Sequence, residues 1–575
     1  MRKPISVLTC LLSAGLAVPA LAQDAGSLLH QQQQRQSALA PSRLPATEEA
    51  SPKSDGIVIA GTESGRTIVV KHLRFSGKLA LLPEAGRARI RAAVEGKRLG
   101  IAGIRAISDA VTMAIQQQGR MLGYAVLPPQ DITEGVVTVE IAEGVLEASD
   151  FERHGTVRAR GERLAAILAG RVDPESVTKP DLEAALLRMN DHAGVTARAR
   201  LMSGAAPHSS RLVIGVEQAP LLSASLWGDN AGSASTGRAE ASAMVTITDL
   251  SGYGDRTQLT STVSEGQRFG QLGFSLPIGT TDFTINANYG YLDYANIDDV
   301  GKALGLEGYA HYAGLELSYS LVRSRDLNVW LSTALNGKAL VDDSLLGRLQ
   351  DKRLVSGRLG IDGERRDAMF GGGLGNWSLG WTYGDLDLSG EPSALAIDQA
   401  SLKTQGDFHV LDARVSRLQQ LPGAFSLFGS VSGQWASTNL DSSQDLSLGG
   451  PGGVRGYPVG EGRGDMGAVG TLELRYDTPL PEAWGELQLA GFLDAGHVWL
   501  NRNAGSVASV NACGCNDYSL ASAGLSARWA RDAMNLSVSW AAGLGDNPGR
   551  SALTGENADG GTSSQQFWLQ GSIKF

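Results

Sequence analysis

The sequence predicts an α+β region of two small modules followed by an all-β transmembrane barrel of about sixteen antiparallel strands. The clearest sign is the C-terminus, where residues 567–575 alternate apolar and polar side chains and end on Phe575. Only a strand, with its period of two, places alternate residues on one face. An apolar face of this kind suits a strand with lipid on one side and water on the other, as in a transmembrane barrel.

The N-terminus of the chain predicts the same location. Two basic residues, Arg2 and Lys3, precede an apolar stretch that ends near Val18, and a small-residue cleavage site ends at Ala22. Residues 1–22 therefore read as a secretory signal peptide, which is too short to span a membrane. Because no later segment offers a long uninterrupted apolar run, we expect strands to cross the outer membrane of a Gram-negative cell.

Composition agrees with a barrel and argues against some other classes of protein. The 73 glycines and a hydrophobic share of 42% are typical of barrels, in which only alternate residues face lipid. The net charge of −10 argues against nucleic-acid binding. Cys513 and Cys515 lie close together, and an oxidising compartment favours a disulfide between them. A metal site is the alternative, but two thiols without a nearby second pair are weak support for one.

Two segments precede the modules. Residues 23–40 include a Gln-rich run with Asp24 as a fair N-cap and Pro41 as a fair stop, which predicts a short polar helix. Because this helix has little apolar face, it could lie in a wet channel, or the segment could be a disordered leader. Residues 41–65 are mostly Pro, Ser, Thr, Glu, Ala and Gly, and they predict a flexible linker.

Residues 66–144 and 145–218 share one order of elements. The first segment has strand-like residues at 67–75, helical patterns at 86–97 and 105–118, and strand-like residues at 124–126 and 136–141. The second has the corresponding elements at 146–151, 161–169, 179–190, 195–201 and 211–216. The repeated order strand, helix, helix, strand, strand predicts two small docking modules in the periplasm.

From about Pro220 onward the helical signal vanishes and alternating segments recur. We count sixteen candidate strands within 219–575, joined by tight turns such as Pro422-Gly423 and by longer polar loops. An even number of strands, with short turns on one side and long loops on the other, is what barrel topology requires. A barrel of this size can enclose a conduit instead of a packed core.

A long Gly-rich loop at about 437–465 and a later strand carry two motifs. The motif residues are Val454, Arg455, Gly456 and Tyr457 in the loop, and Phe492, Asp494 and Gly496 in the strand. In that strand Leu489 and Leu493 share one parity and Asp494 has the other, so Asp494 points into the lumen if the leucines face lipid. A lone lumenal carboxylate needs a cation, and an arginine can bind it through two parallel hydrogen bonds. Arg455 is therefore a candidate to anchor an inward-folded loop at Asp494; the alternative is that the two residues never meet.

These motifs resemble those of the outer-membrane transporters of two-partner secretion, the haemolysin and filamentous-haemagglutinin transporter (TpsB) family. Residues 454–457 match the loop motif V-R-G-Y, and residues 492–496 match the strand motif F-x-D-x-G. Residues 127–137 look like part of the family's first POTRA module, and residues 229–238 look like its first barrel hairpin. The resemblance covers essentially the whole chain after the signal peptide. One departure is His192-Ala193-Gly194, where the family usually shows Leu-Pro-Gly.

The resemblance implies two periplasmic POTRA modules, a plug helix at 23–40, a sixteen-strand barrel and a loop latch made by Arg455 and Asp494. Val454, Gly456, Tyr457, Phe492 and Gly496 would support this latch. It also implies a function, which is the passage of one large unfolded exoprotein, an adhesin or haemolysin, across the outer membrane. The POTRA modules would bind the exoprotein's N-terminal secretion domain, and strand addition at an open sheet edge is the natural mode. Outer-membrane lipid and the barrel-assembly machinery that inserts the barrel would be the other partners.

Two other functions compete with this one. A barrel-assembly insertase of the same superfamily commonly carries three or more POTRA modules, whereas this chain has room for two. The long α/β region argues against a passive porin. We find no P-loop, G-x-S-x-G or H-E-x-x-H motif, so we expect no enzymatic activity, cofactor or metal. Residues 462–467 fit G-x-G-x-x-G and residues 463–465 read Arg-Gly-Asp, but without a βαβ unit the first is a chance match, and in a loop expected to fold inward the second is too.

Overall fold

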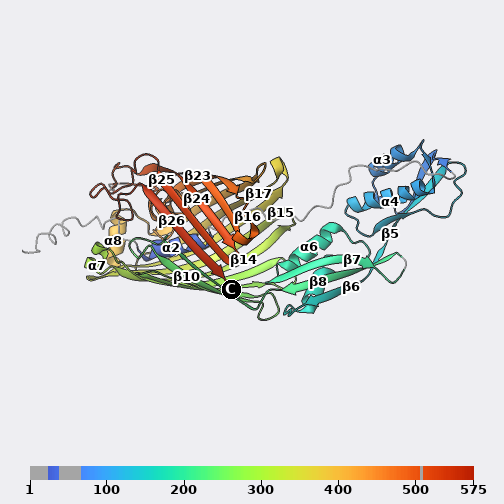
Figure 1. The fold of residues 1–575 in the computed structure, drawn as a ribbon. Helices are drawn as coiled ribbons and strands as arrows, with labels where there is room; N and C mark the ends of the chain where they lie inside the picture. The colour runs from blue at the N-terminus through green and yellow to red at the C-terminus, as the bar shows by residue number, and fades with distance from the viewer. Residues whose placement is uncertain (1–23, 38–66, 207, 506–508, 510) are drawn as a thin grey trace, which may run out of the picture.

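The chain consists of a helix, two α/β modules and a barrel. The computed structural model describes residues 24–37, 67–206, 208–505, 509 and 511–575, so the predicted signal peptide at 1–22 and linker at 41–65 lie outside the described residues. Figure 1 shows helix α2 (Ala25–Ser37) inside the barrel and the two modules beyond one of its ends. Among the described residues, none of the helices is long and apolar enough to cross a membrane.

The first module is a three-stranded sheet covered by two helices. Its sheet has the order β2-β5-β4, in which β2 and β5 are parallel and β4 and β5 are antiparallel. One face of α4 packs on alternate residues of β5 because helical and strand periods place Ile107, Val111 and Ile115 opposite Val137 and Val139. Its elements are β1 (Ile68–Val69), β2 (His72–Gly77), α3 (Glu84–Val94), β3 (Arg98–Leu99), α4 (Ile101–Gln117), β4 (Gly123–Val126) and β5 (Val136–Glu143).

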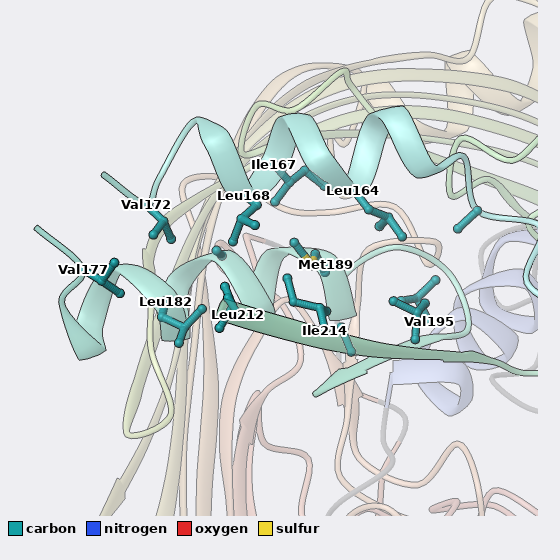
Figure 2. Packing of buried hydrophobic residues seen from close by; sticks show 14 of the residues in the cluster. Leu164, Ile167, Leu168, Val172, Val177, Leu182, Met189, Val195, Leu212 and Ile214 are labelled. Carbon is teal, nitrogen blue, oxygen red and sulfur yellow. The ribbon is translucent and has the colours of Figure 1, made fainter. Parts of the chain in front are cut away.

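The second module has the same connectivity and follows the first after Gly144. Its sheet order is β6-β8-β7, again with a parallel and an antiparallel pair. Figure 2 shows its core, in which apolar residues of both helices, such as Leu164 and Met189, lie over Leu212 and Ile214 of β8. Its elements are β6 (Val145–His154), α5 (Gly161–Ala169), α6 (Lys179–Asn190), β7 (Val195–Ser203) and β8 (Ser209–Gln218).

The described residues after Ala219 form a closed barrel of sixteen antiparallel strands, which confirms the predicted fold class and strand number. Each strand pairs with its neighbour in sequence, and β26 closes the barrel on β9. Residues alternate between the two faces: Val355 is 65% exposed on the outside, whereas the side chain of Leu354 is fully buried inside. The strands are β9 (Leu222–Asp229), β10 (Glu240–Thr248), β11 (Arg256–Val263), β12 (Gln267–Pro277), β13 (Phe283–Ala295), β14 (Glu307–Arg323), β15 (Leu327–Ser344), β16 (Gly347–Asp367), β17 (Gly373–Asp387), β18 (Gly406–Gln420), β19 (Phe425–Ala436), β22 (Met466–Asp477), β23 (Glu486–Trp499), β24 (Asp517–Arg531), β25 (Met534–Gly543) and β26 (Gln565–Lys574).

The expectation that helices end near Pro220 is wrong in two loops. Helices α7 (Asp299–Leu304) and α8 (Pro392–Ala400) lie at the end of the barrel away from the modules (Figure 1). Capping explains α7, since the Asp298 side chain accepts a hydrogen bond from the Gly301 N–H at 2.8 Å and Gly305 ends the helix with a positive φ of 57°. Neither helix buries an apolar stripe, since the buried residues are Gly301 in α7 and Asp398 in α8, so the sequence carries no helical apolar pattern there.

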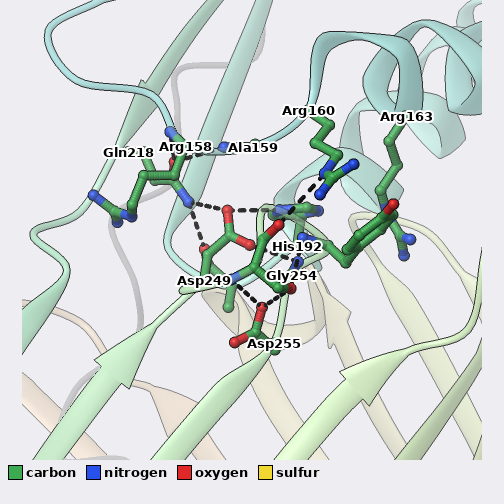
Figure 3. A network of polar contacts seen from close by, with 12 residues as sticks. Arg158, Ala159, Arg160, Arg163, His192, Gln218, Asp249, Gly254 and Asp255 are labelled. Atoms are coloured by element: carbon green, nitrogen blue, oxygen red, sulfur yellow. Dashed lines mark hydrogen bonds and ion pairs between the residues drawn. The ribbon is translucent and has the colours of Figure 1, made fainter.

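A buried polar network joins the second module to the turn between β10 and β11 (Figure 3). His192 Nε2 lies 2.9 Å from Asp249 Oδ2, and the side chains of both residues are almost fully buried. Asp249 also accepts hydrogen bonds from Gln218 Nε2 at 2.6 Å and from the Gly254 N–H at 2.7 Å. Burial raises the pKa of Asp249, but the hydrogen bonds from His192 and Gln218 outweigh it and hold the pKa below its ordinary value of 3.8.

Further polar contacts connect this module to the turn between β12 and β13 and to the end of β14. Arg171 pairs with Asp282 in the turn before β13, and Arg323 Nη2, at the end of β14, lies 2.7 Å from Asp191 Oδ1. Arg188, which is almost fully buried, donates to the Thr281 carbonyl. The helical side of the second module therefore rests on the turns that follow β10, β12 and β14.

Candidate functional site in the barrel lumen

The loop between β19 and β22, residues 437–465, folds over the lumenal wall formed by β23 and β24. Its two ends pair as a short ribbon, β20 (Leu446–Ser447) with β21 (Arg463–Gly464). The tip of the loop closes on itself because the Val454 N–H donates to the Leu448 carbonyl at 2.7 Å. Leu448, Val454 and Tyr457 form a buried apolar cluster with Val498, Tyr518 and Leu520 of the wall. This cluster holds the loop against the wall by burial of apolar surface.

Arg455 at the tip of the loop contacts Asp494 of β23. Arg455 Nε and Nη2 donate to the two carboxylate oxygens of Asp494 at 2.8 and 2.7 Å, and the Arg455 backbone N–H donates to Oδ2 at 3.1 Å. Asp494 is fully buried on the inward face of β23, opposite in parity to the exposed Leu489 and Leu493. The guanidinium also lies 3.3 Å from the centre of the Phe492 ring. The two motif residues therefore meet through a bidentate, charge-assisted pair.

Glu473 of β22 is a part of this cluster that the sequence analysis missed. Arg455 Nη1 donates to Glu473 Oε1 at 2.6 Å, so one guanidinium joins two carboxylates. Arg475 Nε and Arg528 Nη2 also donate to Glu473, at 2.8 and 3.0 Å. The sequence does contain a signal for Glu473. Glu473 and Arg475 alternate with Leu472 and Leu474, so both lie on the inward face of the strand if the leucines face lipid. We name Arg455, Glu473 and Asp494 the latch cluster.

The other motif residues allow the loop to approach the wall closely. A side chain at Gly456 would place its Cβ 2.6 Å from Ser522 Cβ, and one at Gly496 would place its Cβ 2.8 Å from Leu448 Cδ2. Val454 is fully buried and Tyr457 is 3% exposed. Val454, Tyr457 and the two glycines therefore contact their neighbours by packing, and their support of the latch stays a prediction.

Helix α2 occupies the lumen beside the loop. Leu28 and Leu29 pack in a buried cluster with residues of β12 to β15, including Phe269 and Leu292. At the C-terminal end of the helix, Arg35 pairs with Glu240 of β10 and lies 3.4 Å from Asp229 of β9. The predicted polar helix therefore has one short apolar stripe, which faces the wall of the barrel.

The N-terminus of α2 also contacts the 437–465 loop. Asp24 Oδ2 accepts a hydrogen bond from Ser442 Oγ at 2.6 Å. Lys352 of β16 bridges the two elements, since its Nζ lies 3.1 Å from Asp24 Oδ2 and 2.8 Å from Asp441 Oδ2. The helix and the loop are thus held to the same wall residue.

The remaining candidate residues lie outside the latch cluster. Cys513 and Cys515 form a disulfide in the loop between β23 and β24. Within the G-x-G-x-x-G pattern, Arg463 and Gly464 belong to β21 and Met466 begins β22, so a strand follows where a dinucleotide site needs a helix. Asp465 of the Arg-Gly-Asp tripeptide is 3% exposed and accepts hydrogen bonds from the backbone N–H groups of Leu440 and Arg502.

Comparison with known families gives two matches along the chain. Residues 208–526 match the model of the haemolysin secretion/activation protein family ShlB/FhaC/HecB, and residues 68–144 match the POTRA domain of ShlB type. The heme/hemopexin transporter protein HuxB of Haemophilus influenzae is 26% identical over 393 residues, which cover 67% of this chain and 68% of the relative. The outer membrane transporter CdiB of Escherichia coli is 25% identical over 504 residues, 84% of this chain and 80% of the relative.

Solved structures share the fold. CdiB from Escherichia coli superposes with a TM-score of 0.69 at 19% identity and covers 96% of this chain and 99% of that one. BamA from Haemophilus ducreyi lacking POTRA domains 1–3 superposes with a TM-score of 0.53 at 13% identity and covers 88% of this chain and 100% of that one.

Proposed function

Because the chain belongs to the haemolysin secretion/activation family ShlB/FhaC/HecB, we propose that its lumen is the path of an unfolded exoprotein and that α2 and the 437–465 loop close this path at rest. The chain is an outer-membrane transporter of two-partner secretion. The observation that carries the proposal is the contact of Arg455 with Asp494 and Glu473. This contact ties a loop that lies in the lumen to the wall of the same lumen, so the loop is a latch.

The two modules bind the exoprotein before it enters the barrel. Strand addition to a free sheet edge supplies main-chain hydrogen bonds without requiring a particular sequence. The sheet orders β2-β5-β4 and β6-β8-β7 leave edge strands in both modules. Since the helices of the second module face the turns of the barrel, its sheet remains for the exoprotein. The partner is the N-terminal secretion domain of one large exoprotein, an adhesin or haemolysin.

Helix α2 is suited to leave the lumen. Its surface is mostly polar, with a run of four glutamines at residues 31–34, and its apolar contacts come mainly from Leu28 and Leu29. Exit into water therefore exposes little apolar surface, which keeps the cost of exit low. The polar contacts of Asp24 and Arg35 would be replaced by water.

The latch responds to filling of the lumen. A buried ion pair is stable only while its charges remain paired, because an isolated buried charge is very costly. Water that enters with the exoprotein hydrates Arg455, Glu473 and Asp494 and so permits the loop to move away from the wall. Folding of the exoprotein outside the cell would then bias the direction of passage without nucleotide hydrolysis.

The latch is tested by Arg455→Ala and Asp494→Ala, each of which removes one half of the bidentate pair. We expect each to lower export and to shift the loop about ten- to a hundredfold toward its undocked position, because charge-assisted hydrogen bonds of this kind contribute about 1.5–3 kcal/mol. The measurement is the amount of exoprotein in the medium when the transporter is expressed with the exoprotein encoded beside it.

The matched control is Arg417→Ala. Arg417 forms an equally bidentate pair with Asp367, with two bonds of 2.9 Å, but it lies outside the lumen. Outer-membrane fractions should contain folded barrel in all three variants. Export at the wild-type level by both Arg455→Ala and Asp494→Ala would remove the latch from the mechanism.

A further inference from the structure

The last strand of the barrel contacts the latch through Trp568. This residue lies on the inward face of β26 and is 8% exposed. Its indole Nε1–H donates to the backbone carbonyl of Arg455 at 2.9 Å, and the bond is buried. Arg455, whose side chain contacts Asp494, is thus also held through its main-chain carbonyl by a residue of β26.

The same part of β26 has few contacts with the first strand. The ladder between β26 and β9 contains five residue pairs, from Gln570↔Asp229 to Lys574↔Ser225, whereas every other barrel ladder contains eight or more. Among the described residues, Gln565 to Leu569 have no ladder partner in β9. Asn230 covers this stretch, donating from Nδ2 to the Phe567 carbonyl at 2.7 Å and accepting from the Leu569 N–H at 2.9 Å.

The latch loop makes a second contact near the start of β26. Glu461 Oε2 accepts a hydrogen bond from the Ala558 N–H, which precedes the strand, at 2.8 Å. In addition, a Cβ at Gly543, in the neighbouring β25, would lie 3.0 Å from the Tyr457 hydroxyl. Residues 565–569 of β26, which do not pair with β9, therefore contact the loop on their lumenal side.

We propose that Trp568 is a positioning residue that couples the latch to the closing strand of the barrel. Its hydrogen bond fixes the main chain of Arg455, so that the guanidinium meets Asp494 and Glu473 in bidentate geometry. In return, the docked loop holds residues 565–569 of β26, which do not pair with β9, in place. The inference rests on the proposed latch function, since it states which residue orients the latch.

The test removes one hydrogen bond and keeps the ring. Trp568→Phe removes the indole N–H, and replacement of Trp568 by β-(3-benzothienyl)alanine removes it with an almost unchanged shape. The control is Trp540→Phe, whose indole donates to Gln565 Oε1 at 3.1 Å on the exposed side of the neighbouring strand. A variant counts only when it is present as folded barrel in the outer membrane, and the benzothienyl variant serves if the phenylalanine variant does not fold.

The readout is the position of the loop in the purified full chain. Spin labels are placed on Gly452→Cys, whose Cβ would meet no atom within 4 Å, and on Met369→Cys in an exposed turn at the opposite end of the barrel. The native disulfide keeps Cys513 and Cys515 from reacting with the label. We expect both Trp568 variants to shift the ratio of docked to undocked loop roughly five- to tenfold toward undocked, as loss of one buried hydrogen bond does, and Trp540→Phe to leave it unchanged.

Epistasis separates this inference from the function it rests on. In an Arg455→Ala background, Trp568→Phe should not lower export further, because the side chain that it positions is gone. Loop positions in both Trp568 variants that match those of Trp540→Phe would overturn the role of Trp568 and leave the latch intact. Normal export by both Arg455→Ala and Asp494→Ala would instead overturn the latch itself.

Discussion

At the residue scale, Glu473 balances the positive charges around the latch cluster. Its carboxylate accepts hydrogen bonds from three arginines, Arg455, Arg475 and Arg528. Asp494 accepts from Arg455, and also from Thr471 and Ser522 at 3.0 and 3.2 Å. Without the charge of Glu473, three guanidinium groups would lie together, and like charges that are close and poorly solvated repel strongly.

We therefore expect Glu473→Gln to weaken docking of the loop by about 2 kcal/mol, because a charge-assisted acceptor becomes neutral while its arginines remain. The loop-position measurement with labels at residues 452 and 369 would detect the change. Glu316→Gln is the matched control. Glu316 also lies on the lumenal wall, but it belongs to β14 and accepts its hydrogen bond from Asn286, at 3.0 Å. Equal loop positions in the two variants would show that Glu473 does not support the latch.

At the element scale, the second module and the barrel behave as one docked unit. Arg171, just after α5, and Arg188 of α6 reach the barrel turns, and the segment after α6 carries His192. The His192 ring fits against the backbone of Gly254, where a Cβ would lie 2.9 Å from Nδ1. The departure from Leu-Pro-Gly at residues 192–194 thus creates a polar contact between the module and the barrel.

We expect His192→Ala to weaken this contact by about 2 kcal/mol, since it removes one partner of the buried Asp249 carboxylate. Amide hydrogens of residues 249–255 should then exchange faster in the variant than in the wild type. His154→Ala is the control, because His154 lies exposed on the sheet of the same module. Unchanged exchange in residues 249–255 would contradict a role of His192 in docking.

Acid should loosen the same contact in the wild type. The pKa of Asp249 is lower in the folded protein than its ordinary value of 3.8, because the hydrogen bonds from His192 and Gln218 outweigh the effect of burial. Its charge therefore stabilises the docked state above about pH 4, and this contribution disappears as the pH falls through the lower folded value. Exchange of residues 249–255, corrected for intrinsic rates, should rise below pH 4. The rise should be smaller in Asp249→Asn, which has no proton to gain.

At the scale of the whole molecule, two elements from distant parts of the chain fill one lumen. Helix α2 comes from the N-terminal region, and the latch loop lies between β19 and β22. Lys352 contacts both through Asp24 and Asp441. The barrel thus has the width for a conduit, and these elements occupy it.

Deletion of residues 24–37 should raise the conductance of the reconstituted barrel severalfold, because the helix and its buried Leu28 and Leu29 no longer fill the lumen. The measurement is single-channel current in planar bilayers. A milder variant, Arg35→Ala with Gln32→Ala, should open more often than the wild type, since both residues contact Glu240. Arg200→Ala, which changes an exposed pair with Glu152 in the second module, is the control. Wild-type current after the deletion would show that α2 does not close the channel.

The sixteen-strand barrel could be predicted because side-chain parity is a local property. Each strand reveals its lipid face through alternation within a few residues, and the same parity pointed Asp494 away from Leu489 and Leu493. Helices α7 and α8 could not be predicted, because neither buries an apolar stripe: the buried residues are Gly301 in α7 and Asp398 in α8, whereas the predicted helix α5 buries Leu164, Ile167 and Leu168. The contact between Arg455 and Asp494 is observed, and its role in export remains a proposal.

The sequence by itself determined which residues are strands, which faces meet lipid, and that a Gly-rich loop carries one arginine for a lumenal aspartate. Only the tertiary structure decided that Glu473 shares this arginine, that Trp568 holds its carbonyl and that His192 reaches Asp249. The physical reason is sequence distance. These partners lie 18, 113 and 57 residues apart, and their side chains meet only after the barrel closes and fixes the register of every strand.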